Sequence, residues 1–191
     1  MGWRAMKSFS HASDGQFAFA SLTDAINSTA TVCRNEWKYV AELNISIPED
    51  LPPVELILDE FNQVILNMII NAAHAIEDRR LAEKLDDLGK IDIEVSVDGD
   101  DIKIELSDNG GGIPQEIQDK VFEPFFTTKK EGYGVGLGLS TAYGIVERHK
   151  GTILVESSPA GGAQFMIKLP PDQTDPQHQM RKKGKVEHTI N

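Results

Sequence analysis

The chain has 191 residues, of which 40% are hydrophobic and 26% charged, so it is long enough for one domain with extensions and can bury a core. Its net charge of −11 argues against nucleic acid as the main partner, and no apolar stretch approaches the roughly 18 residues of a membrane span. A single cysteine, Cys33, excludes an internal disulfide and a zinc site built from cysteines, which favours a reducing cytoplasmic setting.

The first half of the chain predicts a linker, a helix, a strand and a second helix. Residues 1–20 have weak periodicity, and we interpret them as the end of an upstream region followed by a linker. Residues 21–33 have helical spacing after a capping serine or threonine, and residues 40–47 are typical of a short strand. The strongest helix pattern covers residues 54–80.

The second half predicts two β-hairpins separated by glycine-rich loops and helices. In chain order we expect a hairpin at 91–106, a short helix at 114–121, a glycine-rich loop at 132–138, a helix to residue 149 and a hairpin at 152–169. Hairpins mixed with helices favour an α+β domain over residues 21–171. Its architecture would be a two-layer α/β sandwich with a mixed, mostly antiparallel sheet and helices on one face. Residues 172–191 have the composition of a disordered tail.

A narrow polar stripe runs along the helix expected at 54–80. At about 100° per residue, Asn67 and Asn71 share one face with four other polar side chains, while the remaining surface is apolar. Those four are Glu60, Gln63, His74 and Asp78. A solvated face is one interpretation. However, asparagine is a poor helix former, so two of them one turn apart indicate a local use. Their neutral amide oxygens suit a Mg²⁺ ion that phosphates already hold.

Two glycine segments have the composition of ligand-binding loops. Asp108 follows a strand and precedes glycines that let a ligand approach the backbone, so its carboxylate can accept a hydrogen bond from the exocyclic amine of adenine. Residues 132–138 lead into a helix whose N–H groups can bind an anion. An ordinary turn and a flexible loop without a ligand are the alternatives. Neither segment fits the Rossmann or P-loop spacing.

A hydrophobic and basic segment at residues 121–130 lies between these loops. It combines a proline, the adjacent phenylalanines Phe125 and Phe126, and a pair of lysines. This composition fits an anchor for a mobile flap with cations at its edge. Packing of the phenylalanines into the core is the alternative.

In this order, the segments resemble the ATP-binding catalytic domain of sensor histidine kinases, whose Bergerat-type fold is shared with gyrase, heat-shock chaperone and mismatch-repair ATPases. Residues 67–72 resemble the asparagine box, residues 108–112 the first glycine box, residues 122–126 the phenylalanine box and residues 134–139 the second glycine box. Four boxes in the right order are far more specific than one. The resemblance covers about residues 20–170.

The resemblance implies roles for individual residues. Asn71 would coordinate Mg²⁺ that bridges the ATP phosphates, and Asp108 would bind the adenine amine. Asn67, Asn71 and Lys129 would form the catalytic set, and the ATP lid would extend from about residue 113 to residue 136. The residues implied to contact ATP are Asn67, Asn71, His74, Asp108, Gly110, Gly112, Ile113, Phe125, Thr128, Lys129, Gly134, Gly136, Leu137 and Gly138.

Two positions depart from the patterns of relatives. His74 stands where many relatives carry lysine or arginine, so a phosphate contact there would be pH-sensitive, and Lys129 or Lys130 would be an alternative source of charge. The ATPases of this fold place a glutamate, the base that activates water, four residues before the metal asparagine, where this chain has Asn67. Glu60 lies roughly 16 Å from Asn71 along the helix. The resemblance therefore implies slow hydrolysis, while transfer to a neutral imidazole needs no such base.

None of the five histidines lies in the family's phosphoacceptor pattern. We therefore expect a catalytic module that binds MgATP and phosphorylates a histidine on a separate dimerisation and phosphoacceptor domain, which then passes the phosphoryl group to a response regulator. A stand-alone ATPase and a nucleotide-sensing module without transfer are the alternatives. We expect a cytoplasmic location and no membrane contact by this segment, even where the parent protein is membrane-anchored.

Overall fold

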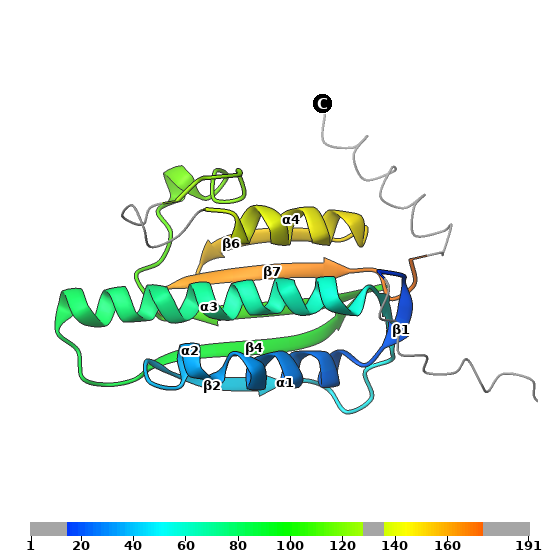
Figure 1. Cartoon of the computed structure of the whole chain (residues 1–191), viewed down its shortest axis with the longest axis horizontal. Helices are drawn as coiled ribbons and strands as arrows, with labels where there is room; N and C mark the ends of the chain where they lie inside the picture. The colour runs from blue at the N-terminus through cyan, green and yellow to red at the C-terminus, as the bar shows by residue number, and fades with distance from the viewer. Residues whose placement is uncertain (1–14, 128–135, 174–191) are drawn as a thin grey trace, which may run out of the picture.

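A five-stranded sheet forms one of the two layers of the fold (Figure 1). The structure is a computed structural model, and it describes residues 15–127 and 136–173. Within these residues the strand order is β2-β4-β5-β7-β6. β2 is parallel to β4, and the other neighbouring strands are antiparallel. The strands are β2 (Ala41–Ser46), β4 (Gly89–Asp98), β5 (Asp101–Asp108), β6 (Thr152–Ser157) and β7 (Ala163–Leu169).

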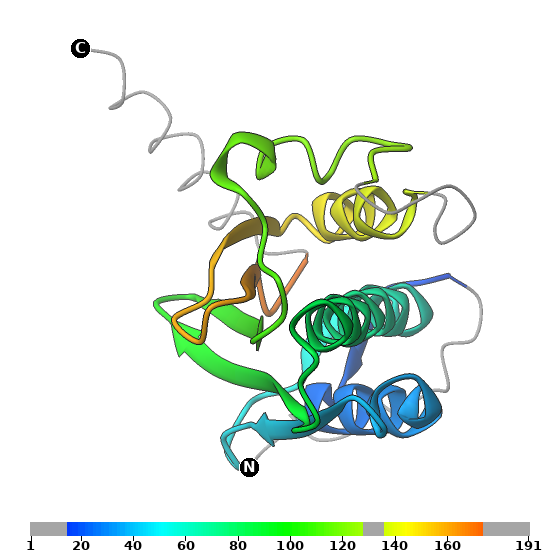
Figure 2. The same cartoon turned by 90° about the vertical axis from the view of Figure 1, so that its left-hand side faces the viewer.

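Helices form the second layer and cover one face of the sheet (Figure 2). The helices are α1 (Leu22–Val32), α2 (Arg34–Trp37), α3 (Leu58–Glu83) and α4 (Gly138–Arg148). The strands alternate accordingly: Ile104 of β5 is buried against the helices, while its neighbours Lys103 and Glu105 face the open side and form an ion pair. The predicted α+β class, with a mixed, mostly antiparallel sheet, is confirmed.

Helix α3 lies between α1 and α4 and fills the centre of the helical layer (Figure 2). Its sheet-facing side is entirely apolar, and burial of this side is the main force that holds the helix on the sheet. The buried residues of α3 are Phe61, Val64, Ile65, Met68, Ile69, Ala72, Ala73 and Ile76. Helix α1 begins as predicted, because the Ser21 hydroxyl accepts a hydrogen bond from the Asp24 N–H over 3.2 Å.

The helix predicted to begin at residue 54 begins instead at Leu58. The residues before it form β3 (Val54–Leu56), which pairs antiparallel with β1 (Ala18–Ala20), inside the segment expected as a linker. Two prolines precede β3 and favour an extended backbone, and the alternating Val54 and Leu56 are both buried. The apolar run that we assigned to one helix is therefore a short strand followed by a helix.

Strand β3 also contacts the end of the described chain. The Glu55 N–H donates to the Pro171 carbonyl over 2.8 Å, and the Gln173 N–H donates to a Glu55 carboxylate oxygen over 2.8 Å. Gln173 is buried, so the chain packs on the domain as far as residue 173. Residues 1–14 of the expected linker and residues 174–191 of the expected tail lie outside the described residues.

The helix predicted at residues 114–121 is only a single 3-10 turn, Gln115–Ile117. The turn ends early because a helix of two turns is not stable by itself, and the Gln118 side chain donates to the Ile113 carbonyl instead. Across the described ranges, no helix has both the length and the apolar character needed to cross a bilayer.

Candidate nucleotide site

The asparagines of α3 lie on the side of the helix near the start of α4. Asn67 is half-buried, and its Nδ2 donates a hydrogen bond to the Gly138 carbonyl over 3.1 Å. Asn71, one turn further along, is also half-buried, and its side chain makes no hydrogen bond within the described residues. The predicted stripe is therefore not a fully solvated face: its middle borders α4 and leaves the Asn71 amide available for a ligand.

Asp108 is a buried carboxylate at the end of β5, only 3% exposed. Its Oδ1 accepts two backbone hydrogen bonds, from Gly110 over 2.8 Å and from Ala163 over 3.3 Å. Burial raises the pKa of Asp108, and the two N–H groups partly oppose that effect. Among the described residues nothing bonds to Oδ2, so this oxygen can accept a hydrogen bond from a ligand amine.

Glycines bring the Asp108 loop against α3. A Cβ at Gly110 would lie 2.7 Å from the Ala75 carbonyl carbon, so only glycine fits this contact. Ala75 is one turn beyond Asn71 on α3. The loop that carries Asp108 and the helix that carries Asn71 therefore lie on the same side of the molecule. Gly112, with a φ of 72°, continues this loop in a conformation that favours glycine.

A backbone hydrogen bond joins the middle of the segment expected as the lid, residues 113–136, to its C-terminal border. The Phe125 N–H donates to the Gly136 carbonyl over 3.0 Å, and a Cβ at Gly136 would lie 2.6 Å from the Phe126 carbonyl oxygen. Gly136 has a φ of 72° and Phe125 a φ of 65°. Gly136, Leu137 and Gly138 thus connect this border directly to α4. Thr128, Lys129, Lys130 and Gly134 lie outside the described residues.

The two adjacent phenylalanines have different surroundings. Phe126 packs against the hydrophobic core, as do Phe122 and the half-buried Ile113, whereas the Phe125 side chain is 70% exposed. The left-handed backbone at Phe125 turns its ring away from the core. Packing into the core therefore holds for Phe122 and Phe126, whereas the Phe125 ring is presented to solvent, and the flap itself stays a prediction.

The remaining polar members of the stripe have separate positions. His74 is half-buried on the same helix, one turn beyond Asn71. Glu60 forms an ion pair with Arg148 at the other end of α4. Glu60 is therefore held by α4 at a position about two turns before Asn67 on α3.

Sequence reasoning missed two supports of the Asp108 loop. Arg79 donates from Nη1 to the Asn109 carbonyl over 2.7 Å, although the charged stretch that contains it gave no signal beyond a solvated helix end. Gly162 packs so closely on Asp108 that any Cβ there would overlap the carboxylate. Its position in the turn of the second hairpin offered no signal, because the contact joins residues far apart in the sequence.

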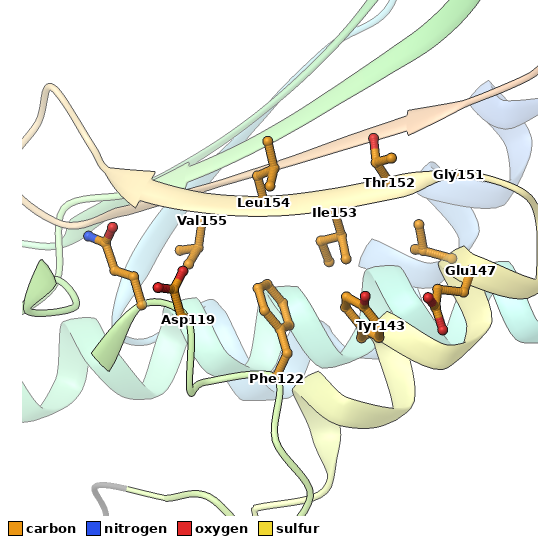
Figure 3. A pocket seen from close by; sticks show the side chains of 11 residues that line it. Asp119, Phe122, Tyr143, Glu147, Gly151, Thr152, Ile153, Leu154 and Val155 are labelled. Carbon is orange, nitrogen blue, oxygen red and sulfur yellow. The ribbon is translucent and has the colours of Figure 1, made fainter. Parts of the chain in front are cut away.

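A pocket of about 420 Å³ lies on the side of α4 that faces away from α3 (Figure 3). Phe122 and Tyr143 point toward Ile153 and Val155 of β6 across it, and Asp119 and Glu147 lie at its edges. None of the predicted site residues lines this pocket, so it is distinct from the asparagine and glycine site.

The sequence pattern of one protein family matches residues 58–173, which include α3, the Asp108 loop and α4. That family is described as histidine kinase-, DNA gyrase B-, and HSP90-like ATPases. The chain belongs to this family. The match covers the asparagines, the glycine segments and the phenylalanine segment, and it confirms the predicted family and makes the chain an ATP-binding domain.

Relatives in this ATPase family are sensor kinases. The chain is 38% identical over 135 residues to sensor kinase CckA of Brucella abortus, an alignment that covers 68% of this chain and 14% of CckA. It is 38% identical over 138 residues to sensor histidine kinase ZraS of Escherichia coli K12, which covers 71% of this chain and 27% of ZraS. The alignments therefore span less than a third of these relatives.

The fold is similar to a solved structure from the same family. The catalytic domain of histidine kinase ThkA, in a nucleotide-free form, has a TM-score of 0.70 and 28% sequence identity. The alignment covers 83% of this chain and 97% of the ThkA chain. The part of the chain that aligns is thus equivalent to an entire catalytic domain.

Proposed function

We propose that the chain is the catalytic module of a sensor histidine kinase. It binds MgATP and transfers the γ-phosphoryl group to a histidine on a separate dimerisation and phosphoacceptor domain, from which a response regulator receives it. One observation carries the proposal. The buried carboxylate of Asp108, with an open oxygen, and the open amide of Asn71 share one side of the molecule with the N-terminus of α4.

Adenine binds at Asp108. The Oδ1 atom is occupied by two backbone N–H groups, so Oδ2 accepts the exocyclic amine of adenine. Guanine has a carbonyl at the corresponding position. That carbonyl and the Asp108 Oδ2 are both acceptors, so no hydrogen bond would form between them. The arrangement therefore selects ATP over GTP, since a buried acceptor left without a donor is costly.

The phosphates lie toward α3 and α4. The backbone N–H groups near Gly136 and Gly138 are at the N-terminus of α4, where the helix dipole favours negative charge. Gly110, Gly112, Ile113, Phe125 and Leu137 are assigned to the nucleotide by the resemblance of their segments to the family. Thr128, Lys129 and Gly134 are assigned to it by the resemblance of their segment to the family.

The residues present fit a magnesium ion bound together with ATP. The Asn71 amide supplies a neutral, hard oxygen, which completes the coordination of an ion held mainly by phosphates without adding charge. When bound, Mg²⁺ neutralises the charge on the phosphates during transfer. Asn67 holds the start of α4 beside this position, and Lys129 or a protonated His74 would supply further positive charge.

Transfer is favoured over hydrolysis. The residue at position 67 is an amide that cannot take a proton from water, and its Nδ2 is already bonded to the Gly138 carbonyl. Glu60 is paired with Arg148. A neutral imidazole nitrogen attacks phosphorus without a base, so the module needs only to position ATP and stabilise its charge.

The domain boundaries and the location follow from this function. We propose that residues 21–171 form the body of the catalytic domain. Residues 1–20, the last of which pair with β3 as β1, would connect it to the acceptor domain, and residues 172–191, of which Gln173 packs on Glu55, would lead into a tail. The module would act in the cytoplasm, where ATP is available, without itself touching the membrane.

The test is phosphoryl transfer to a separately produced phosphoacceptor domain of the parent protein. With γ-labelled ATP and Mg²⁺, label should appear on the acceptor histidine, and Asn71→Ala should reduce labelling more than ATP binding. Normal ATP binding without labelling would contradict the kinase function and favour a nucleotide sensor. Rapid phosphate release without the acceptor would favour a stand-alone ATPase.

A further inference from the structure

Helices α3 and α4 lie side by side and antiparallel (Figures 1 and 2), and polar contacts join them at both ends of α4. At the nucleotide end, Asn67 bonds to Gly138. At the far end, Ile57 bonds to His149, and Glu60 pairs with Arg148. At 1.5 Å per residue, the Ile57–His149 contact lies about 15 Å from the Asn67–Gly138 contact along α3 and about 16 Å from it along α4. Because these two spacings nearly match, the Ile57–His149 and Asn67–Gly138 contacts can form at the same time when the two helices are straight.

His149 uses both ring nitrogens at the far end. Its Nδ1 donates to the Ile145 carbonyl over 2.8 Å, and its Nε2 accepts a hydrogen bond from the Ile57 N–H over 2.9 Å. Ile57 precedes α3, where no side chain of the helix itself caps the free N–H groups. The neutral ring of α4 thus supplies the acceptor that the N-terminus of α3 lacks.

The surroundings hold this ring in place. His149 is 1% exposed, and the Phe17 ring contacts it edge-on at a centroid distance of 5.0 Å. The charged groups that act on the ring are Glu60 of α3 and Arg148 of α4, while Phe17 carries no charge. One Glu60 oxygen pairs with Arg148, and the other lies 4.0 Å from Nδ1.

We propose that His149 is a positioning residue which, with the Glu60–Arg148 pair, fixes the position of α4 along α3. The inference rests on the proposed function, because the end of α4 that it positions is the one assigned to the phosphates. Apolar helix surfaces pack in several neighbouring registers, and a directional hydrogen bond at Ile57 selects one of them. A slip toward another register would move Gly138 away from Asn67 and Asn71.

This role predicts a selective effect on the phosphate part of the site. Asp108 and its loop are held by β5, β7 and α3, and none of these contacts involves α4. Loss of the His149 contact should therefore weaken the binding of MgATP and leave the binding of adenosine almost unchanged. A merely destabilised protein would lose both ligands in the same proportion.

The first test compares His149→Leu, His149→Gln and the exposed control Glu147→Gln in the full chain, by calorimetric titration with MgATP and with adenosine. His149→Leu should weaken MgATP binding about tenfold, the scale of one directional hydrogen bond, with adenosine within about twofold. Glutamine places an amide oxygen near the Nε2 position, so His149→Gln should recover most of the affinity. Equal losses for both ligands, or no recovery with glutamine, would overturn the inference.

A second measurement needs no nucleotide. Spin labels at the exposed positions Gln63 of α3 and Glu147 of α4 report the position of one helix along the other. Their distance distribution should shift or broaden in His149→Leu and not in His149→Gln. An unchanged distribution would overturn the inference, whereas failure of the natural chain to bind ATP would overturn the proposed function alone. If His149→Leu does not fold, Arg148→Gln replaces it. This variant should weaken MgATP binding and shift the distance distribution in the same direction but to a smaller extent. No change in either measurement would contradict the inference.

Discussion

The Asn67 side chain donates a hydrogen bond of 3.1 Å to the Gly138 carbonyl and so links the asparagine stripe to the start of α4. In relatives that hydrolyse ATP, the resemblance places a water-activating glutamate at this position. Here the amide acts as a donor toward a backbone carbonyl. Position 67 thus carries a structural contact in this chain, in place of the acid–base role that the resemblance implies for those ATPases.

Asn67→Asp should strongly weaken MgATP binding. The substitution removes the Nδ2 donor, sets a carboxylate against the Gly138 carbonyl and adds a negative charge near the phosphates. We expect a loss of affinity of about tenfold or more and a loss of about 1 kcal/mol in the free energy of unfolding. Titration calorimetry and urea denaturation measure the two effects. Gln63→Glu, the matching amide-to-acid change at an exposed position one turn earlier, should alter neither; comparable losses in both variants would argue against the assignment.

Asp108→Asn should change the choice of base. The asparagine Oδ1 can still accept from Gly110 and Ala163, but an NH₂ group replaces the Oδ2 acceptor and opposes the adenine amine. ATP affinity should fall about tenfold or more, and the ratio of GTP to ATP affinity should rise, because guanine offers a carbonyl there. Competition titrations with both nucleotides measure this ratio. Asp119→Asn, at an exposed position beside the separate pocket, is the control, and an unaltered ratio in Asp108→Asn would remove adenine from this site.

Gly110→Ala should destabilise the fold by about 1–3 kcal/mol, the scale of overpacking. The added Cβ would lie 2.7 Å and 2.8 Å from the Ala75 carbonyl carbon and Cβ, and the backbone of α3 cannot easily move. Gly111→Ala is a matched control, because a Cβ there meets nothing within 4 Å. It should stay within about 0.5 kcal/mol of the natural chain in urea denaturation. Equal stability of the two variants would show that the loop is not packed on α3.

Stability should decrease as the pH falls below about 6.5, the ordinary pKa of histidine, because of His149. Burial lowers the pKa of His149 in the folded state, so the unfolded chain takes up the proton first. The contribution of His149 to the free energy of unfolding is complete above pH 6.5 and is lost as the pH falls through the lowered pKa of His149 in the folded state. Thermal denaturation between pH 5 and 7.5 measures it, and His149→Gln should flatten the decrease. The raised pKa of Asp108 makes the folded state more stable as the pH falls, and it does so equally in the natural chain and in His149→Gln. Identical pH slopes of the melting temperature in these two proteins would therefore exclude His149 as the cause.

The elements that the sequence predicted well have strong repeating patterns. Asn67 and Asn71 stand out because α3 is long and its other faces are apolar, and Asp108 stands out because it ends a clearly alternating strand. The strand β3 was missed because three residues are too few for a period, and its partner β1 lies far away in the sequence. Each of the two segments, β1 and β3, is a strand only because it pairs with the other.

Contacts that depend on local backbone angles or on distant residues could not be predicted. Phe125 and Phe126 are identical in type and adjacent, yet Phe125 has a left-handed φ and an exposed ring, whereas Phe126 packs against the core. Gly162 and Arg79 support the Asp108 loop from other elements, and the role of His149 depends on Ile57, far from it in the chain. The roles of the residues at 128–134 remain predictions.

Strand β3 has a mechanical consequence. It is paired with β1 on one side and with Pro171 on the other, and it continues through Ile57 into α3. Tension applied at β1 or at Pro171 would therefore reach the three residues of β3, directly before the helix that bears Asn71. We expect that movements of neighbouring domains would reach the ATP site through this junction sooner than through the sheet.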